Sequence, residues 1–163
     1  MDVREIMTSP AITVTPETEI REVARLMREH QISGVPVVDA AGRLVGIITE
    51  LELIARNAPL HEPHYIGVLS AVIPVSLEEY REYKEQLRQV LATNAGDLMR
   101  QEVKAIAPGD STEKALELML DPEVTMLPVV ENERVIGVVT RTDLVRLIET
   151  LESAPDEPSQ PGV

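Results

Sequence analysis

The sequence predicts a mixed α/β (α+β) fold built from two copies of one small unit, and three observations support this. The 163 residues are 44% hydrophobic but only 2% aromatic, so the core must consist of aliphatic side chains. Branched aliphatic residues are abundant, and they favour buried strands over a purely helical bundle. Short apolar runs alternate with segments in which apolar residues recur every three or four positions, and this order occurs twice along the chain.

The repeat appears when the chain is shifted against itself by the distance from Met7 to Met99. The same shift matches Pro16 with Pro108, Leu26-Met27 with Leu118-Met119, and Pro36-Val37-Val38 with Pro128-Val129-Val130. After a one-residue deletion in the second copy, the matches continue with Arg43 and Arg134, Gly46 and Gly137, Thr49 and Thr140, and Leu53 and Leu144. Because the identities keep one order and one spacing, we interpret them as a duplication. The first unit spans residues 1–55 and the second unit spans residues 95–150.

Each copy predicts the same succession of elements. In the first copy, Ile12–Thr15 is a short strand and Thr18 is the N-cap of an amphipathic helix. Ile32–Val38 and Leu44–Ile48 are two further strands joined by a turn, and a second helix begins near Thr49. In the second copy, a capping box at residues 110–113 precedes a helix, and residues 124–130 and 135–139 are strands.

Residues 56–94 are not repeated and form an insert between the units. Its first part, residues 57–64, has the composition of a loop. A capping box at Ser76 then begins a helix that runs to Ala92. The apolar face of this helix contains Tyr80, Tyr83, Leu87, Val90 and Leu91. The acidic, proline-rich tail, residues 151–163, is predicted to be disordered.

Composition argues against several classes of function. The formal charge of −13 opposes binding to the phosphate backbone of DNA or RNA, so we expect no nucleic-acid partner. No apolar run reaches the roughly 18 residues that a membrane-spanning helix needs, so we expect no membrane partner. The absence of cysteine excludes thiolate metal sites and cysteine nucleophiles, and it fits a reducing compartment. We therefore expect a cytoplasmic protein.

An enzyme is the class of function that the sequence supports least. The sequence contains no recognised order of catalytic-triad residues, no glycine-rich phosphate loop and no cluster of metal ligands. His61, Glu62 and His64 lie close together, but Pro63 prevents them from sharing a helical face. We interpret that segment as a surface loop and expect neither catalytic residues, nor a metal site, nor a resident cofactor.

The strongest motif is a strand ending in Pro-Val-Val, a turn, and a Gly-h-h-Thr-x-x-Asp/Glu-Leu segment, where h is an apolar residue. The first copy has it in residues 33–38 and 46–53, and the second in residues 126–130 and 137–144. Two such motifs in register resemble a tandem pair of cystathionine-β-synthase (CBS) domains, called a Bateman module. The resemblance implies two β-α-β-β-α units packed pseudo-symmetrically through their sheets. It also implies a cleft between the units for an adenosine-containing ligand, either AMP, ADP or ATP, or S-adenosylmethionine.

The same resemblance implies two ligand sites, each combining residues of both units. The Thr140 site contains Val138, Thr140, Arg141 and Asp143 together with Ile32, Ser33, Gly34, Ser9, Pro10 and Ala11. The Thr49 site contains Ile47, Thr49 and Glu52 together with Val124, Thr125 and Met126. A hydroxyl and a carboxylate three residues apart suit the 2′ and 3′ hydroxyls of a ribose, and Thr and Asp also commonly cap helices. Glu52 stands where the motif has Asp, and we therefore expect the Thr49 site to be the weaker one.

These features favour a stand-alone regulatory module that signals to an effector protein in trans and forms a homodimer. The inserted helix is expected to contribute to the dimer, because its apolar stripe requires a cover. A purely structural dimerisation module with vestigial sites is the alternative. A magnesium sensor is a third hypothesis, which the high negative charge allows although no carboxylate cluster locates a site.

Overall fold

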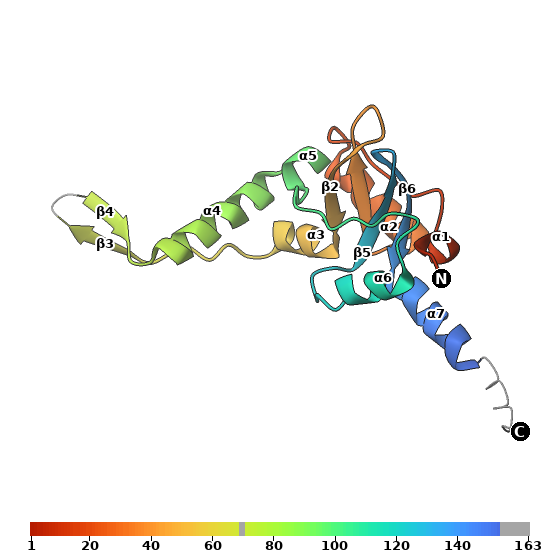
Figure 1. The fold of residues 1–163 in the computed structure, drawn as a ribbon. Helices are drawn as coiled ribbons and strands as arrows, with labels where there is room; N and C mark the ends of the chain where they lie inside the picture. The colour runs from red at the N-terminus through yellow and green to blue at the C-terminus, as the bar shows by residue number, and fades with distance from the viewer. Residues whose placement is uncertain (69–70, 154–163) are drawn as a thin grey trace, which may run out of the picture.

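The computed structural model describes residues 1–68 and 71–153 (Figure 1). The first unit contains α2 (Ile20–His30), β1 (Gly34–Val38), β2 (Leu44–Thr49) and α3 (Glu50–Asn57). The second unit contains α6 (Thr112–Leu118), β5 (Met126–Glu131), β6 (Arg134–Thr140) and α7 (Arg141–Ser153). Each unit begins with a short helix, which is α1 (Val3–Ile6) in the first and α5 (Ala95–Leu98) in the second. The duplication seen in the sequence is therefore also present in the structure.

Each unit is centred on an antiparallel strand pair, β1 with β2 and β5 with β6. The first strand predicted in each copy is wrong in extent. Residues 12–15 contribute one parallel bridge, from Val14 to Val37, and the second copy repeats it from Ile106 to Val129. Pro10 and Pro16 bracket the predicted strand, and proline has no backbone N–H to extend a ladder.

The helix starts follow the predicted caps in part. The Ser76 hydroxyl accepts a hydrogen bond from the Glu79 amide at 3.2 Å and confirms the predicted N-cap of α4. The box predicted over residues 110–113 begins one residue too early, because the N-cap of α6 is Ser111, whose hydroxyl accepts from the Lys114 amide at 3.3 Å. Thr18 does not cap α2, which begins after Glu19. The Thr18 hydroxyl instead accepts a hydrogen bond from the Thr15 amide at 3.1 Å and closes the preceding turn.

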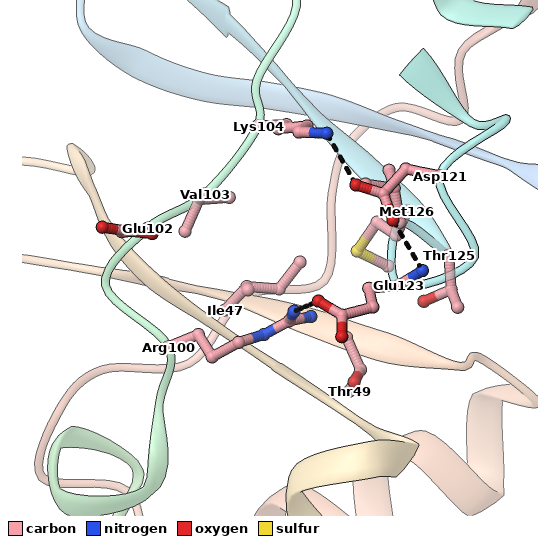
Figure 2. Close-up of a pocket in the computed structure, with 11 residues that line it drawn as sticks. Ile47, Thr49, Arg100, Glu102, Val103, Lys104, Asp121, Glu123, Thr125 and Met126 are labelled. Atoms are coloured by element: carbon pink, nitrogen blue, oxygen red, sulfur yellow. Dashed lines mark hydrogen bonds and ion pairs between the residues drawn. The ribbon is translucent and has the colours of Figure 1, made fainter. Parts of the chain in front are cut away.

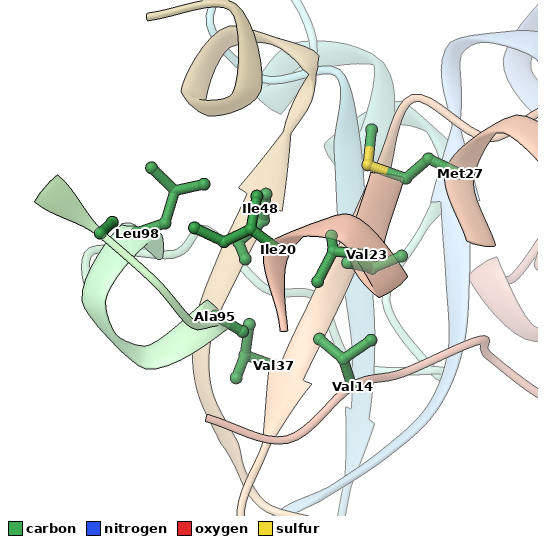
Figure 3. Close-up of a cluster of buried hydrophobic side chains, with 10 residues drawn as sticks. Val14, Ile20, Val23, Met27, Val37, Ile48, Ala95 and Leu98 are labelled. Carbon is green, nitrogen blue, oxygen red and sulfur yellow. The ribbon is translucent and has the colours of Figure 1, made fainter. Parts of the chain in front are cut away.

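The first helix of each unit is buried in the core of the other unit. Ala95 and Leu98 of α5 are fully buried in the first unit, against residues such as Ile20, Val37 and Ile48 (Figure 3). Val3 of α1 is fully buried in the second core, which also contains Ile106, Leu127, Val129, Val139, Leu144 and Leu147. Backbone hydrogen bonds mirror the exchange. Val3 donates to Asp110 at 2.9 Å, and Ala95 donates to Thr18 at 2.8 Å.

The units meet through their sheets, as the resemblance implied. A third buried cluster contains Ile47 from β2, Met126 from β5 and Val138 from β6. Farther along the sheets, Arg43 forms an antiparallel bridge with Arg134, and the Val135 amide donates to the Gly42 carbonyl at 3.1 Å. The strands of both units consequently lie together at the centre of the molecule (Figure 1).

The insert forms an arm that projects from this body (Figure 1). It consists of a hairpin, β3 (Tyr65–Val68) with β4 (Ala71–Pro74), and the helix α4 (Leu77–Leu91). The sequence analysis identified the helix but not the hairpin. Residues Tyr80, Tyr83, Leu87 and Val90 of the predicted stripe are half-buried, and α4 contacts α3, whereas Leu91 is exposed. The stripe is thus partly covered within its own chain.

The predicted tail begins later than expected. Residues 151–153 complete α7 instead of starting an irregular segment. The remainder of the predicted tail, residues 154–163, lies outside the described residues.

Candidate functional site

The Thr49 pair lies where β2 passes into α3. The Thr49 amide and hydroxyl both donate to one carboxylate oxygen of Glu52, Oε2, at 2.7 and 2.6 Å. The Leu51 amide donates to the Thr49 hydroxyl at 3.3 Å, so the pair forms a capping box at the start of α3. Glu52 is buried, and its other oxygen, Oε1, lies 2.8 Å from Nε of Arg100.

The Thr140 pair repeats this arrangement where β6 passes into α7. The Thr140 amide and hydroxyl donate to Oδ2 of Asp143, each at 2.8 Å. Its Oδ1 lies 3.5 Å from the Thr8 hydroxyl and 3.4 Å from Arg146 Nη1. Both pairs therefore have the capping geometry. In each pair, one carboxylate oxygen accepts the hydrogen bonds of the cap. The other oxygen faces the first residues of the other unit, at Arg100 for Glu52 and at Thr8 for Asp143.

That facing segment is held by backbone pairing in both units. Ile47 and Arg100 exchange two backbone hydrogen bonds of 2.9 Å, and Thr8 and Val138 exchange two of 2.8 and 3.0 Å. A Cβ added to Gly137 would lie 2.8 Å from the Thr8 carbonyl oxygen, so only glycine allows this approach. The repeat therefore makes Arg100 the counterpart of Thr8, and Glu52 the counterpart of Asp143.

A cavity of about 480 Å³ lies at the Thr49 site (Figure 2). Five of the six residues predicted for that site line it, namely Ile47, Thr49, Val124, Thr125 and Met126. Because β2 belongs to the first unit and residues 124–126 to the second, the cavity combines both units. Its volume falls in the range of small-molecule sites. The site that we ranked second from the sequence is thus the one that contains this cavity.

The sequence analysis missed six other residues of the cavity lining: Arg100, Glu102, Val103, Lys104, Asp121 and Glu123. The repeat could have predicted two of these residues, Glu102 and Val103. Residues 101–103 correspond to Ser9, Pro10 and Ala11, which we had included in the Thr140 site, but the symmetric assignment was not made.

The charged groups of the cavity form ion pairs. Lys104 Nζ lies 2.7 Å from Asp121 Oδ2 (Figure 2). The hydrogen bond from Lys104, with help from the Glu123 amide, holds the pKa of Asp121 below its usual value. Arg100 contacts Glu52 from one side and lies 3.8 Å from Glu123 on the other. The cavity therefore presents cations and carboxylates together rather than a field of one sign.

The residues predicted for the Thr140 site are placed as follows. Val138 packs near Ala11 in the cluster between the units, and the Ser9 hydroxyl donates to the Ile136 carbonyl at 2.8 Å. Gly34 pairs with Thr49, so residues 32–34 lead into the start of β1 beside the start of α3. Arg141 Nη2 donates to the carbonyls of Asp121 and Pro122, and it therefore braces a loop of the Thr49 cavity.

The histidine segment of the insert shows no metal site. The side chain of His64 is largely exposed, and its Nδ1 lies 3.5 Å from Glu79 Oε2. Within residues 1–68 and 71–153, no group of three or more His, Asp or Glu side chains is arranged to hold a metal ion. No helix in the described part of the chain is long and apolar enough to cross a membrane.

Comparison with known families identifies the repeated unit. The family model of the CBS domain matches residues 3–58 and again residues 95–150. The chain belongs to the CBS-domain family. The matched segments coincide with the two units of the fold, and the arm lies largely outside both of them.

Several relatives of this CBS pair are known. An uncharacterized protein of Methanocaldococcus jannaschii, MJ1426, is 32% identical over 155 residues, which cover 91% of each chain. The crystal structure of CBSX2, an Arabidopsis thaliana protein, in complex with AMP has a TM-score of 0.75 at 23% identity and covers 93% of this chain and 98% of that one. The CBS domain pair of MJ0100 in complex with 5′-methylthioadenosine and S-adenosyl-L-methionine has a TM-score of 0.68 at 22% identity, with 93% and 98% coverage. These similarities confirm the fold.

Proposed function

We propose that this CBS pair is a regulatory module that binds an adenosine-containing ligand in the Thr49 cavity and signals to an effector protein in trans. The observation that carries the proposal is a cavity that joins both units and contains a threonine hydroxyl, aliphatic walls and cationic groups. Such a set suits a ribose, a base and a 5′ substituent, respectively. CBSX2 with AMP and MJ0100 with adenosine derivatives support this ligand class.

The location of the cavity also supports a regulatory role. A ligand seated there contacts β2 of the first unit and the start of β5 in the second, so its binding energy depends on how the two units are placed. A ligand with different affinities for two arrangements shifts the population between them. The Thr140 site remains a second proposed position for the same ligand class.

A thermal-shift panel tests the ligand class. We expect AMP or S-adenosylmethionine to stabilise the protein by about 2.7 kcal/mol at 100 times its dissociation constant. For a chain of this size, this corresponds to a rise in Tm of about 5–10 °C. GMP controls for the base, and magnesium chloride alone tests the sensor of divalent cations. A panel without any adenosine response would contradict the proposal and favour a purely structural module.

Matched substitutions then locate the site. Thr49→Val removes the hydroxyl from the cavity, and Thr140→Val makes the same change at the equivalent position of the second unit. We expect Thr49→Val to weaken AMP binding by about tenfold in calorimetric titration, the cost of one hydrogen bond to a buried partner. If only Thr140→Val weakened binding, the ligand would belong to the Thr140 site.

We further propose that the module is a homodimer. The outer faces of α3 and α7 expose apolar side chains, namely Leu51, Ile54, Val145, Ile148 and Leu151. Apolar stripes on two equivalent helices suit a self-complementary interface. The exposed Leu77 and Leu91 of α4 extend the apolar surface onto the arm.

Sedimentation analysis tests this interface. We expect the wild type to be dimeric and the double variant Ile54→Asp/Val145→Asp to be monomeric but folded. Leu120→Asp is the control, because Leu120 is exposed on the loop after α6. A monomeric wild type would contradict the proposal, and so would a variant that stays dimeric.

A further inference from the structure

We infer that Arg100 makes the Thr49 cavity select adenosine ligands that carry a negatively charged 5′ group. This inference rests on the proposed function and goes beyond it, because it names the ligand class and the residue that sets it. The proposal is specific to one of the two sites, since the equivalent position in the other unit is Thr8.

Arg100 is fixed where a ligand would meet it. Its backbone exchanges two hydrogen bonds with Ile47, whose side chain lines the cavity. Its own side chain also lines the cavity and is 34% exposed, so the guanidinium is reachable from solvent. Figure 2 shows it between the end of β2 and Glu123.

The guanidinium has hydrogen-bonding capacity left over. It forms ion pairs with Glu52 at 2.8 Å and Glu123 at 3.8 Å. The contact with Glu52 is made by the buried Nε, whereas Nη1 lies 3.8 Å from Glu123, beyond hydrogen-bond distance. Since arginine has five N–H donors in a planar fork that matches phosphate and carboxylate oxygens, donors remain for an anionic ligand.

Lys104, the other cation of the cavity, is already committed. Its ammonium forms a 2.7 Å hydrogen bond with Asp121, which keeps that carboxylate ionised by lowering its pKa. A phosphate approaching Lys104 would have to compete with this carboxylate. Arg100 meets Glu52 through Nε alone and keeps the N–H groups of its two terminal nitrogens for another acceptor, so it is the better available partner for an anion.

A second unpartnered group points to a ligand in the same cavity. The hydroxyl oxygen of Thr125 is buried and lacks a hydrogen-bond partner among the described residues. A buried hydroxyl without a partner carries a cost that a bound polar group can remove. Thr125 lines the same cavity as Arg100, and we assign its hydroxyl as the second polar group for the ligand.

The second unit provides the internal comparison. There Thr8 faces Asp143 at 3.5 Å, in the place where Arg100 faces Glu52. The same backbone pairing thus holds a neutral residue against a shorter carboxylate. The double variant Arg100→Thr/Glu52→Asp reproduces this natural pair at the Thr49 site and avoids leaving Glu52 buried opposite a missing cation.

Calorimetric titration with AMP and with adenosine tests the inference, because the two probes differ only in the 5′ phosphate. We expect the wild type to bind AMP about 10- to 100-fold more tightly than adenosine, the range for a hydrogen bond to a charged group. In the double variant, we expect this ratio to fall to within about threefold, while adenosine affinity is retained. Arg21→Thr on the surface of α2 controls for the loss of one positive charge and should keep the wild-type ratio.

The outcomes separate the two proposals. If neither probe binds to the wild type and S-adenosylmethionine gives no thermal shift, both the proposed function and the role of Arg100 are wrong. If only S-adenosylmethionine binds, the role of Arg100 alone is overturned. If both probes bind but the ratio is near one in the wild type, or is unchanged in the double variant, only the role of Arg100 is overturned.

Discussion

Replacing Leu98 with alanine is expected to lower the free energy of unfolding by about 2–5 kcal/mol. Leu98 lies at the start of the second unit in sequence, yet it is fully buried in the core of the first unit. Removing its side-chain carbons leaves a cavity in the core cluster that also contains Ile48 and Val23, which are fully buried and cannot move inward freely. Urea unfolding followed by circular dichroism measures the change.

Leu120→Ala is the matched control, because Leu120 is 81% exposed. The same chemical change there is expected to alter stability by no more than about 0.5 kcal/mol. Equal effects at the two positions would show that α5 does not belong to the first core. The exchange of first helices between the units would then be wrong.

Replacing Glu52 with alanine is expected to destabilise the fold by about 2–4 kcal/mol. Two losses contribute. The capping box of α3 loses the acceptor for the Thr49 amide and hydroxyl, and Arg100 loses the closer of its two ion-pair partners. The half-exposed position of Arg100 lets water solvate part of the abandoned guanidinium, so we place the cost below that of a fully buried pair.

Glu50→Ala is the control for this variant. Glu50 occupies the first turn of the same helix but is exposed, so only a favourable interaction with the helix N-terminus is lost. We expect less than about 1 kcal/mol at this position in the same unfolding experiment. If Glu50→Ala were as damaging as Glu52→Ala, the buried contacts of Glu52 would not be the source of its effect.

The fold could be predicted largely because the sequence is duplicated. Motifs such as Pro36-Val37-Val38 and Thr49-x-x-Glu52 occur twice in register, and periodicity then assigned a strand or helix to each segment. The elements that were not predicted depend on tertiary contacts. The helices α1 and α5 have four residues each, too short for a periodic signal, and they exist because Val3 and Leu98 are buried in distant cores.

The candidate site was predicted in part for a related reason. Thr49 and the strand residues 124–126 belong to the repeated motif and were identified. Arg100, Lys104, Asp121 and Glu123 have no identical residue at the matched position of the other copy, so the repeat gave no signal for them. Glu52 was expected to weaken the site because it stands where the motif has Asp. The Glu52 carboxylate contacts Thr49 and Arg100. This conformation depends on an arginine that lies 48 positions later in the sequence.

The exchange of α1 and α5 constrains how this chain folds during synthesis. Val3 donates its backbone hydrogen bond to Asp110 and packs against residues as late as Leu147. The ribosome adds about 5–20 residues per second, so the N-terminal helix waits on the order of 7–30 s before its binding surface is complete. The core of the first unit likewise lacks Leu98 until the arm has been translated. Nascent chains arrested before residue 98 should therefore be protease-sensitive throughout. Resistance should appear first in the first unit, once Leu98 has left the ribosome, and in the second unit only after Leu147 has been added.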